Sequence, residues 1–399
     1  MAQIIIVGAG PAGVTLAWVL AQRGIPVTLI EASRSFRRLF RGEALMPSGL
    51  EALAQMGLLS LLEHLPHRPL DAWSFWVERR SLFQVCEPID PDRLPCTLVS
   101  QPALLQALIA KASSFPTFEF LSGHPVQFLQ WQEGRVSGVI LGNGHRPTAD
   151  LVIGADGRHS LVRQQAGLTL DEQEHPFDLL WFKLADGPTL PTTNVFHSVI
   201  TGRHAFGLFR SSEGELQVGW VLHREDARAW KTVHWPEQLA AASPSWLAAH
   251  FRAYAQTITR PMLLSVTVGR APRWSVPGLL LLGDAVHPMS PIRAQGINMA
   301  LRDVIVAANH LVPLLMGKRD LNALDAALPQ IQAEREPDII RVQHLQRTEM
   351  AQGELLRENR LIRQAASGLA PILGKVVKRS WIRRQRQLRQ GVTSVRLRV

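Results

Sequence analysis

Residues 4–13 read Ile-Ile-Ile-Val-Gly-Ala-Gly-Pro-Ala-Gly, and this stretch decides the fold. Its first four residues form a continuous apolar run, which is typical of a parallel strand covered on both faces. A helical pattern follows over Val14–Gln22, and Pro26–Ile30 reads as a second strand that ends at Glu31. The sequence therefore predicts a complete βαβ unit within about 30 residues.

The glycines at positions 8, 10 and 13 have the spacing of a dinucleotide-binding turn. Gly8 suits a tight turn, Gly10 lets the backbone approach a pyrophosphate, and Gly13 allows close packing of helix on strand. The helix N-terminus then offers free N–H groups and a partial positive charge to phosphates. Glu31 follows at the end of the second strand, where a carboxylate can accept hydrogen bonds from a ribose. Tight packing alone would also explain the glycines, but the combined pattern favours a Rossmann-like dinucleotide-binding domain.

Two further stretches indicate which dinucleotide is bound. Residues 154–163 read Gly-Ala-Asp-Gly-Arg-His-Ser-Leu-Val-Arg, between a strand and a helix. The second stretch begins with residues 283–288, Gly-Asp-Ala-Val-His-Pro, and continues through Pro291 to residues 295–298, Gln-Gly-Ile-Asn. With the N-terminal motif, these stretches resemble the group A flavoprotein monooxygenases of the p-hydroxybenzoate hydroxylase type. The resemblance covers most of residues 1–320 and is only architectural in the inserted sheet.

The resemblance implies an FAD site built from all three motifs. Arg41 would lie near the pyrophosphate and the flavin edge, and Asp156 would serve both FAD and nicotinamide binding. Asp284 would bind the ribityl chain of the flavin. The implied FAD-binding residues are Gly8, Gly10, Pro11, Ala12, Gly13, Glu31, Ala32, Arg41, Gln101, Asp156, Gly283, Asp284, Pro291, Gly296, Ile297 and Asn298.

The same resemblance places the flavin ring at the third motif. Pro291 would lie beside the isoalloxazine ring, and Gly296 and Asn298 would lie beneath its pyrimidine end. Reduced flavin carries negative charge at N1, and N–H groups at the start of the helix over residues 296–315 would stabilise that charge.

The sequence departs from the family pattern at three positions. Ala294 stands where many members have Gly, and Gln101 stands where many have Arg. Gln101 can still donate hydrogen bonds to FAD. Arg293 is a charged residue at a variable position, where it faces either the active site or the surface.

The resemblance implies oxygenation of an aromatic or quinone-like small molecule. NAD(P)H would reduce FAD, and O₂ would form a C4a-hydroperoxyflavin that transfers oxygen to the substrate. A second glycine-rich motif is missing, which fits transient binding of NAD(P)H. Such chemistry needs no Ser/His/Asp triad and no metal, and we expect neither. His287 lies in the third motif, where a structural role is expected rather than a catalytic one.

The substrate wall is expected in the inserted sheet. Its candidate residues carry aromatic rings on strand-like segments, although each ring alone is more typical of sheet packing. Arg210 would pair with an acidic substrate, and ring stacking would orient a neutral one. Weak catalytic candidates are His223, Arg210 and Arg293, and the substrate candidates are Trp181, Phe206, Phe209 and Trp220.

The element order predicts a Rossmann-like α/β domain interrupted by a mostly antiparallel sheet and followed by a helical tail. Helices are expected over 47–62, 101–112 and about 235–254; residues 67–97 look irregular; and Gly142-Asn143-Gly144 suggests a hairpin turn. The predicted domains are FAD-binding at 1–66, 98–171 and 269–328; substrate-binding at 67–97 and 172–268; and a basic helical region at 329–399.

The net charge of +10 resides entirely in residues 351–399, which hold ten Arg and two Lys against Glu354 and Glu358. The rest of the chain is neutral, which disfavours a nucleic-acid-binding body. As a helix, Lys375–Gln390 would either dock on the FAD domain, the favoured interpretation, or contact an anionic membrane, an acidic partner or nucleic acid. No signal peptide and no run of about 18 apolar residues is apparent. We expect a cytoplasmic protein, either fully soluble or membrane-peripheral, that is a monomer or a homodimer, with Cys86 and Cys96 reduced.

Three other functions stay open. A flavin-dependent halogenase would carry a Trp-x-Trp-x-Ile-Pro segment and an early active-site lysine, whereas Trp73 and Trp76 have different spacing and the first lysine is Lys111. A flavin-dependent reductase of isoprenoid-type double bonds would suit an apolar cavity, but Pro291 and the preceding motif fit hydroxylases better. A non-catalytic flavin-binding protein is the third alternative.

Overall fold

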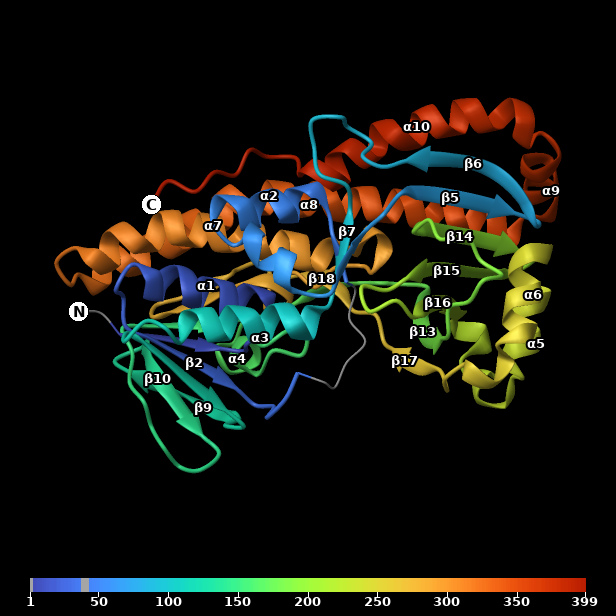
Figure 1. Ribbon diagram of the computed structural model, residues 1–399. Coiled ribbons are helices and arrows are strands. Elements are labelled where there is room, and N and C mark those ends of the chain that lie inside the picture. The colour runs from blue at the N-terminus through green and yellow to red at the C-terminus, as the bar shows by residue number, and fades with distance from the viewer. Residues whose placement is uncertain (1–2, 37–42) are drawn as a thin grey trace.

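The computed structural model describes residues 3–36 and 43–399 as two sheet-centred lobes that lie side by side (Figure 1). The first lobe contains the N-terminal βαβ unit, and the second contains the inserted sheet. The long helix α8 (Leu321–Glu358) runs along both lobes. The C-terminal segment returns to the first lobe.

The first lobe is organised by a six-stranded sheet in the order β19-β20-β11-β1-β2-β8. Strand β1 pairs in parallel with both β2 and β11, so the N-terminal apolar run is a central, fully buried strand. The predicted βαβ unit is confirmed. The strands are β1 (Ile4–Val7), β2 (Val27–Glu31), β8 (Phe118–Ser122), β11 (Leu151–Gly154), β19 (Ser275–Val276) and β20 (Leu279–Leu281).

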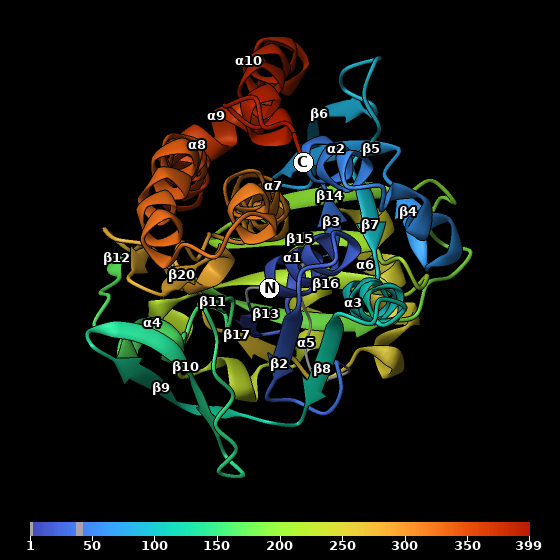
Figure 2. The same ribbon diagram turned by 90° about the vertical axis from the view of Figure 1, so that its left-hand side faces the viewer.

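Helices α1 (Pro11–Gln22), α3 (Gln101–Ala112) and α7 (Gln295–Met316) cover one face of this sheet (Figure 2). The hairpin of β9 (Val126–Gln132) and β10 (Arg135–Leu141) lies on the opposite side. Within the described ranges, the helix Ile292–Met316 alone has the length and apolar composition of a membrane span. Most of its apolar window is buried inside the protein, as expected of a core helix.

The hairpin turn predicted at residues 142–144 is present, since the Leu141 N–H donates to the His145 carbonyl at 2.9 Å and Gly138 forms an antiparallel bridge with Thr148. The two strands expected to flank this turn do not form one ladder, however. Strand β10 pairs with the preceding strand β9, and the residues after the glycines form β11 beside β1. All four residues of β11 are buried, because helices and the β9–β10 hairpin cover both faces of the central sheet. The helix expected over 47–62 also divides, because Gly57 adopts a φ of +72° between α2 (Pro47–Gln55) and a 3₁₀ turn (Leu59–His64).

The second lobe is a seven-stranded sheet in the order β17-β13-β16-β15-β14-β5-β6, in which only the β14–β5 pair is parallel. Residues 67–97, expected to be irregular, contribute β5 and β6, so that expectation was wrong. Both segments assigned to a substrate domain thus supply strands, although the division into domains remains our interpretation. The strands are β5 (Ala72–Val77), β6 (Arg80–Cys86), β13 (Phe177–Leu184), β14 (Val195–Thr201), β15 (His204–Arg210), β16 (Leu216–His223) and β17 (Met262–Leu264).

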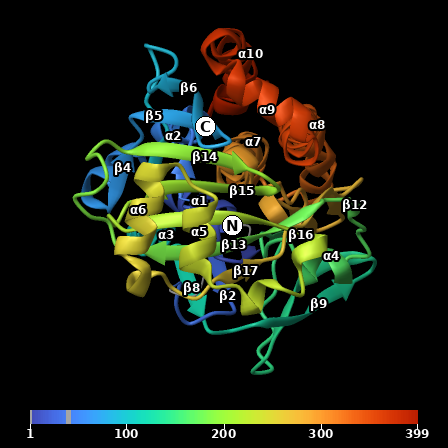
Figure 3. The ribbon, with the colours of Figure 1, turned by 90° about the vertical axis from the view of Figure 1, so that its right-hand side faces the viewer.

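Two helices, α5 (Trp235–Ala241) and α6 (Ser245–Ala253), cover the outer face of this sheet (Figure 3). They replace the single helix expected over 235–254, because Pro244 caps the start of α6. The remaining elements are short. They are β3 (Ala44–Leu45), β4 (His67–Pro69), β7 (Thr97–Val99), β12 (Asp171–Gln173), β18 (Val268–Arg270), α4 (Leu161–Gln165) and 3₁₀ turns at 224–226, 230–232, 255–257, 283–285 and 292–294.

The C-terminal helices α9 (Arg360–Gly368) and α10 (Ala370–Gln390) dock on the body, which confirms the favoured interpretation of the basic tail. Trp381 and Leu388 are buried, and α10 packs on β6. Arg389 donates from Nη2 to Oε2 of Glu87 at 2.6 Å. The last residues then run back along the first lobe, where the Val395 carbonyl accepts from Gln55. The boundary predicted at residue 329 lies inside α8.

Candidate functional site

The three sequence motifs meet at the carboxyl ends of β1, β11 and β20. Leu282, directly after β20, donates from its backbone N–H to the carbonyl of Gly154 at 2.9 Å. Gly283 has a φ of +60°, and a Cβ added there would lie 3.4 Å from the Cβ of Ala12. Open parallel sheets bind their ligands at this edge. The motifs therefore form one candidate site.

At two of the three glycines of this turn a Cβ would clash with the protein, and at the third it would not. A Cβ on Gly8 would lie 2.4 Å from the Ala155 carbonyl oxygen, and one on Gly13 would lie 1.9 Å from the Gly8 carbonyl oxygen. Gly10 has φ −74° and ψ −178°, and the nearest atom to its added Cβ is 4.0 Å away. The protein's own packing therefore requires Gly8 and Gly13, whereas Gly10 faces open space at the uncapped start of α1.

Glu31 holds the glycine turn against the end of β2. Its Oε2 accepts a hydrogen bond from the Ala9 N–H and its Oε1 accepts one from the Ser33 N–H, both at 2.9 Å. Each carboxylate oxygen keeps a further lone pair for a ligand hydroxyl. Ala32 is exposed beside it. Arg41 lies outside the described residues.

Asp156 accepts hydrogen bonds at the start of the short helix that follows β11, whose N-cap residue is Ser160. Its Oδ1 accepts from the Ser160 hydroxyl at 2.5 Å, and its Oδ2 accepts from the Val162 N–H at 3.1 Å. Burial raises the pKa of Asp156, and these hydrogen bonds offset part of that effect. Arg163, on the same helix, donates to the carbonyl of Ala285 at 2.6 Å. The second motif is thereby joined to the third.

The start of α7 presents free backbone N–H groups at the third motif. Ala294 caps this helix in a left-handed conformation, without a side-chain hydrogen bond to the first turn. The exposed Asp284 places its Oδ1 3.5 Å from where a Cβ on Gly296 would lie. Pro291 and Ile297 are partly exposed in the same region. A ligand at this position would meet a helix N-terminus and one carboxylate.

Asn298 is buried and its amide is engaged by the protein's own backbone. Its Oδ1 accepts from the Met46 N–H at 2.8 Å, and its Nδ2 donates to the Ala294 carbonyl at 2.6 Å. The side chain therefore fixes the start of α7 against the residues before α2, a positioning contact that sequence reasoning missed. Gln101 is buried in the first turn of α3.

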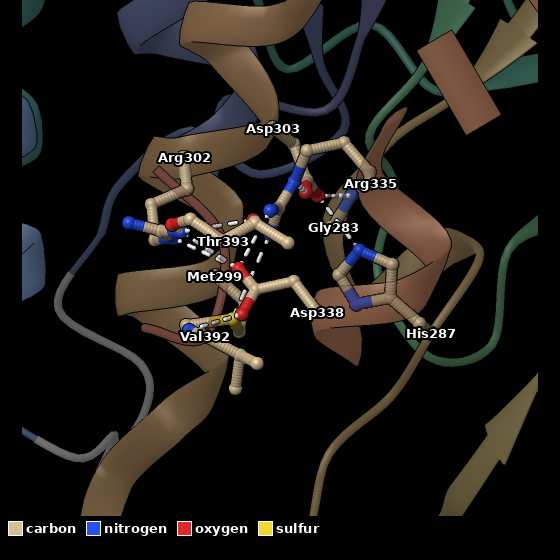
Figure 4. A network of polar contacts seen from close by, with 9 residues as sticks. All are labelled: Gly283, His287, Met299, Arg302, Asp303, Arg335, Asp338, Val392 and Thr393. Atoms are coloured by element: carbon tan, nitrogen blue, oxygen red, sulfur yellow. Dashed lines mark hydrogen bonds and ion pairs between the residues drawn. The ribbon is translucent and has the colours of Figure 1, made fainter. Parts of the chain in front are cut away.

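A buried ionic network lies directly behind the third motif (Figure 4). Asp303 accepts from the Gly283 N–H at 3.1 Å, from Nε2 of His287 at 2.7 Å and from Nε of Arg335 at 2.8 Å. Arg335 also donates to Asp338 at 2.7 Å, and Asp338 accepts from Arg302 at 3.0 Å. These contacts support the structural role expected for His287.

This network also anchors the C-terminal segment. Asp338 accepts from the Val392 N–H at 2.8 Å, and Arg302 donates to the Thr393 carbonyl at 2.6 Å. Burial alone would raise the pKa of Asp303, but His287 and Arg335 outweigh that effect and hold the pKa below its usual value. No local sequence pattern signals this network, because its members come from α7, α8 and the third motif.

The predicted aromatic substrate wall divides between the two faces of the second sheet. Trp181 and Phe209 lie on the face toward the first lobe, with ring centroids 6.2 Å apart, and Phe209 shares a cluster with Met46. Phe206 and Trp220 stack on the opposite face, under α5 and α6. For Phe206 and Trp220 the predicted substrate role was therefore wrong, because helices bury them in a separate core.

Arg210 is committed to protein contacts, and His223 is buried without a hydrogen bond at Nε2. Arg210 donates from Nε and Nη2 to Asp186, at 2.6 and 2.9 Å, and its remaining contacts are backbone carbonyls. The predicted pairing of Arg210 with an acidic substrate is thus contradicted, because this carboxylate already occupies the guanidinium. His223 is buried at the end of β16, 3.7 Å from Glu354, where burial lowers its pKa.

Glu43 joins the two lobes, and sequence reasoning assigned it no role. Its Oε2 accepts from the N–H and the hydroxyl of Ser212, both at 3.0 Å, and its Oε1 accepts from Gln217 at 3.3 Å. Burial raises the pKa of Glu43 despite these hydrogen bonds. Within residues 3–36 and 43–399, no cluster of three His, Cys, Asp or Glu side chains suits a metal ion.

Comparison with known proteins adds the family. The family model described as FAD binding domain matches residues 1–338. The chain is 35% identical over 363 residues to 6-methylpretetramide 4-monooxygenase of Streptomyces rimosus, which covers 86% of this chain and 82% of the relative. It is 28% identical over 358 residues to 3-demethoxyubiquinol 3-hydroxylase of Escherichia coli, covering 82% and 83% of the two chains.

A solved structure shows the same fold. The p-nitrophenol 4-monooxygenase of Pseudomonas putida superposes with a TM-score of 0.80 at 18% identity, over 99% of each chain. Together with the three motifs at one sheet edge, these likenesses confirm the predicted family and fold class. The chain belongs to the group A FAD-dependent monooxygenases, oxidoreductases that use FAD with NAD(P)H as the electron donor.

Proposed function

We propose that FAD lies along the edge formed by the three motifs, with its pyrophosphate at Gly10 and a ribose at Glu31. The open side of Gly10, above the uncapped first turn of α1, supports this placement, because nothing in the protein's own packing requires a glycine there. The proposed binding residues are Gly8, Gly10, Pro11, Ala12, Gly13, Glu31, Ala32, Arg41, Gln101, Asp156, Gly283, Asp284, Pro291, Gly296, Ile297 and Asn298.

Bound FAD supplies the electron transfer from NAD(P)H and the activation of O₂. The chain's own residues bind, orient and shield the cofactor. The N–H groups at the start of α7 offer partial positive charge to an anionic ring system. Asn298 and the ionic network behind Gly283 hold that helix and its preceding turn in place. No protein nucleophile is proposed.

We propose that the substrate is an uncharged aromatic or quinone-like molecule. The observation that carries this proposal is the half-buried ring of Trp181, which meets the buried ring of Phe209 edge-on, on the sheet face toward the first lobe. Arg210 is saturated by Asp186 and by carbonyl groups, so it offers no free cation for a carboxylate. Two relatives, named as acting on 6-methylpretetramide and 3-demethoxyubiquinol, agree with this class.

Replacing Trp181 by Leu should raise the KM for an aromatic substrate at least tenfold and change the FAD content little, because the ring wall is lost while the cofactor edge is intact. The measurement is substrate-stimulated NAD(P)H oxidation over a panel of phenols and quinones, each paired with a carboxylated analogue. Trp246→Leu is the matched control, since that half-buried ring packs on the opposite face. Preference for the carboxylated analogues, or equal KM values in both variants, would count against the proposal.

We further propose a cytoplasmic protein, monomeric or homodimeric, that contacts an anionic membrane surface through the tip of α9 and α10. Exposed apolar side chains gather there, including Leu361 and Leu369, with Ile372 at 71% and Val376 at 66% exposure. Ile372 and Val376 share one helix face at a spacing of four residues. The exposed cations next to them are Arg360, Lys375, Arg379 and Arg383. Apolar side chains framed by cations suit an anionic bilayer rather than an uncharged partner.

The double variant Ile372→Ser, Val376→Ser should bind vesicles containing phosphatidylglycerol at least fivefold more weakly, with an unchanged unfolding temperature, because both side chains already contact water. Phe128→Ser is the control: this residue is 57% exposed on β9, at the opposite end of the molecule. Co-sedimentation with anionic and neutral vesicles measures the effect. Equal sedimentation of all three proteins would rule out this contact.

A further inference from the structure

Arg293 has an unusual backbone conformation at a sensitive position. Five non-glycine residues in the described part of the chain have positive φ, and three of them lie in the turns of two hairpins. The other two are Arg293 (φ 60°) and Ala294 (φ 48°), directly before α7. Left-handed conformations are strained for residues with a Cβ and persist where the surroundings enforce them. Something must therefore hold this turn.

The guanidinium of Arg293 is enclosed by three aromatic rings. Its Cζ lies 5.4 Å from the ring centre of Trp73, 5.3 Å from that of Phe75 and 5.2 Å from that of Trp381. Its Nε donates to Oε2 of Glu349 at 2.7 Å, and the two side chains are 11% and 8% exposed. Cation–π contacts and a shielded ion pair together fix this side chain.

The enclosing residues come from three separate parts of the molecule. Trp73 and Phe75 belong to β5 of the second lobe, Glu349 to α8, and Trp381 to α10. The second carboxylate oxygen of Glu349 accepts from Gln385, also on α10. The cage therefore joins the turn before α7 to the second sheet and to both long C-terminal helices.

Helix α8 also holds the backbone of the same turn. Gln346 donates from Nε2 to the Ser290 carbonyl at 2.8 Å and to the Ile292 carbonyl at 2.7 Å. Gln295, at the first position of α7, donates to the Arg293 carbonyl at 2.7 Å. The turn thus has side-chain anchors on both sides of the strained residues, and Arg293 is the anchor at their centre.

We infer that Arg293 and its aromatic cage form a lock that sets the turn between Pro291 and Gly296 and thereby positions the FAD. Arg293 is a positioning residue, since its side chain points into the cage and leaves the N–H groups of α7 to meet the cofactor. The inference rests on the proposed placement of FAD. It also assigns a function to the buried face of α10, which supplies Trp381 to the cage and Gln385 to Glu349 and so supports the turn that would contact FAD.

The test compares two substitutions of the same residue in the full-length protein. Arg293→Ala empties the cage and leaves a Cβ in the left-handed conformation, whereas Arg293→Gly empties the cage but adopts that conformation without strain. FAD-free protein is titrated with FAD by flavin fluorescence, and the reduction potential is measured at saturating FAD. We expect the Kd to rise at least tenfold in Arg293→Ala and distinctly less in Arg293→Gly, with a shifted potential in the Ala variant.

Arg363→Ala is the matched control, because it also removes a buried arginine, in this case one on α9 and outside the cage. The partners of Arg363 are Glu78 and the carbonyls of Leu356 and Arg357. It should leave the Kd within twofold of the parent value and the potential unchanged. Wild-type affinity in Arg293→Ala, or equal Kd increases in all three variants, would overturn the lock. Failure of the wild-type protein to bind FAD would instead overturn the proposed cofactor placement.

Discussion

The substitution Gly10→Ala is expected to lower the affinity for FAD at least 100-fold while the chain still folds. A Cβ at this position meets no atom of the protein closer than 4.0 Å, and the backbone angles are allowed for alanine. The same Cβ would occupy the space that a pyrophosphate needs at the start of α1. Gly10→Ala should therefore weaken FAD binding and leave folding intact. FAD titration measures the first effect, and far-UV circular dichroism of the FAD-free protein measures the second.

Two other glycine-to-alanine variants serve as references for Gly10→Ala. Gly13→Ala should prevent folding or lower stability severely, because its Cβ would lie 1.9 Å from the Gly8 carbonyl oxygen. Gly353→Ala, in an open position on α8, should alter neither folding nor FAD affinity. If Gly10→Ala bound FAD like the parent protein, the pyrophosphate would have to lie elsewhere.

Replacing Asp303 by Ala should cost about 3–5 kcal/mol of unfolding free energy, the range for breaking a buried ion pair by removing one partner. Its loss leaves the guanidinium of Arg335, the ring of His287 and the Gly283 N–H without their acceptor. Urea unfolding measures the change. The exposed pair of Glu51 and Arg93 is the control, and Glu51→Gln should cost less than about 1 kcal/mol.

The same network predicts sensitivity to acid. The pKa of Asp338, which burial alone would raise, is held below its usual value by Arg335 and Arg302, as that of Asp303 is by its neighbours. Because these pKa values are lower in the folded state, the unfolded chain takes up protons first. The stabilisation is complete above about pH 4, the usual aspartate range, and is lost as the pH falls further. A wild-type stability that did not fall in acid, or an Asp303→Ala cost below about 1 kcal/mol, would contradict these expectations.

The sequence predicted what local patterns encode. The apolar run of β1, the glycine turn and Glu31 lie close together in the chain, and the structure brings them together as expected. The helical tail docks because Trp381 and Leu388 lie on one side of α10, a periodicity visible in the sequence. The three motifs converge because parallel strands end at a common edge.

Pairings between distant segments were beyond sequence reasoning. Strand alternation places Phe206 and Phe209 on opposite faces, but it cannot tell which face α5 and α6 cover. The partner of Arg210 is Asp186 on another strand end, and the cage of Arg293 needs residues from β5, α8 and α10. Such contacts are set by packing of the lobes, which one sequence does not record.

Above all, we expect this chain to insert one oxygen atom from O₂ into an aromatic or quinone-like molecule. Turnover of the FAD-loaded protein with NAD(P)H under isotopically labelled ¹⁸O₂, followed by mass spectrometry of the product, tests this expectation most directly. We predict one ¹⁸O atom in the product for each NAD(P)H oxidised in a coupled turnover. A product reduced at a double bond without O₂ uptake, a halogenated product, or bound flavin without any turnover would contradict it.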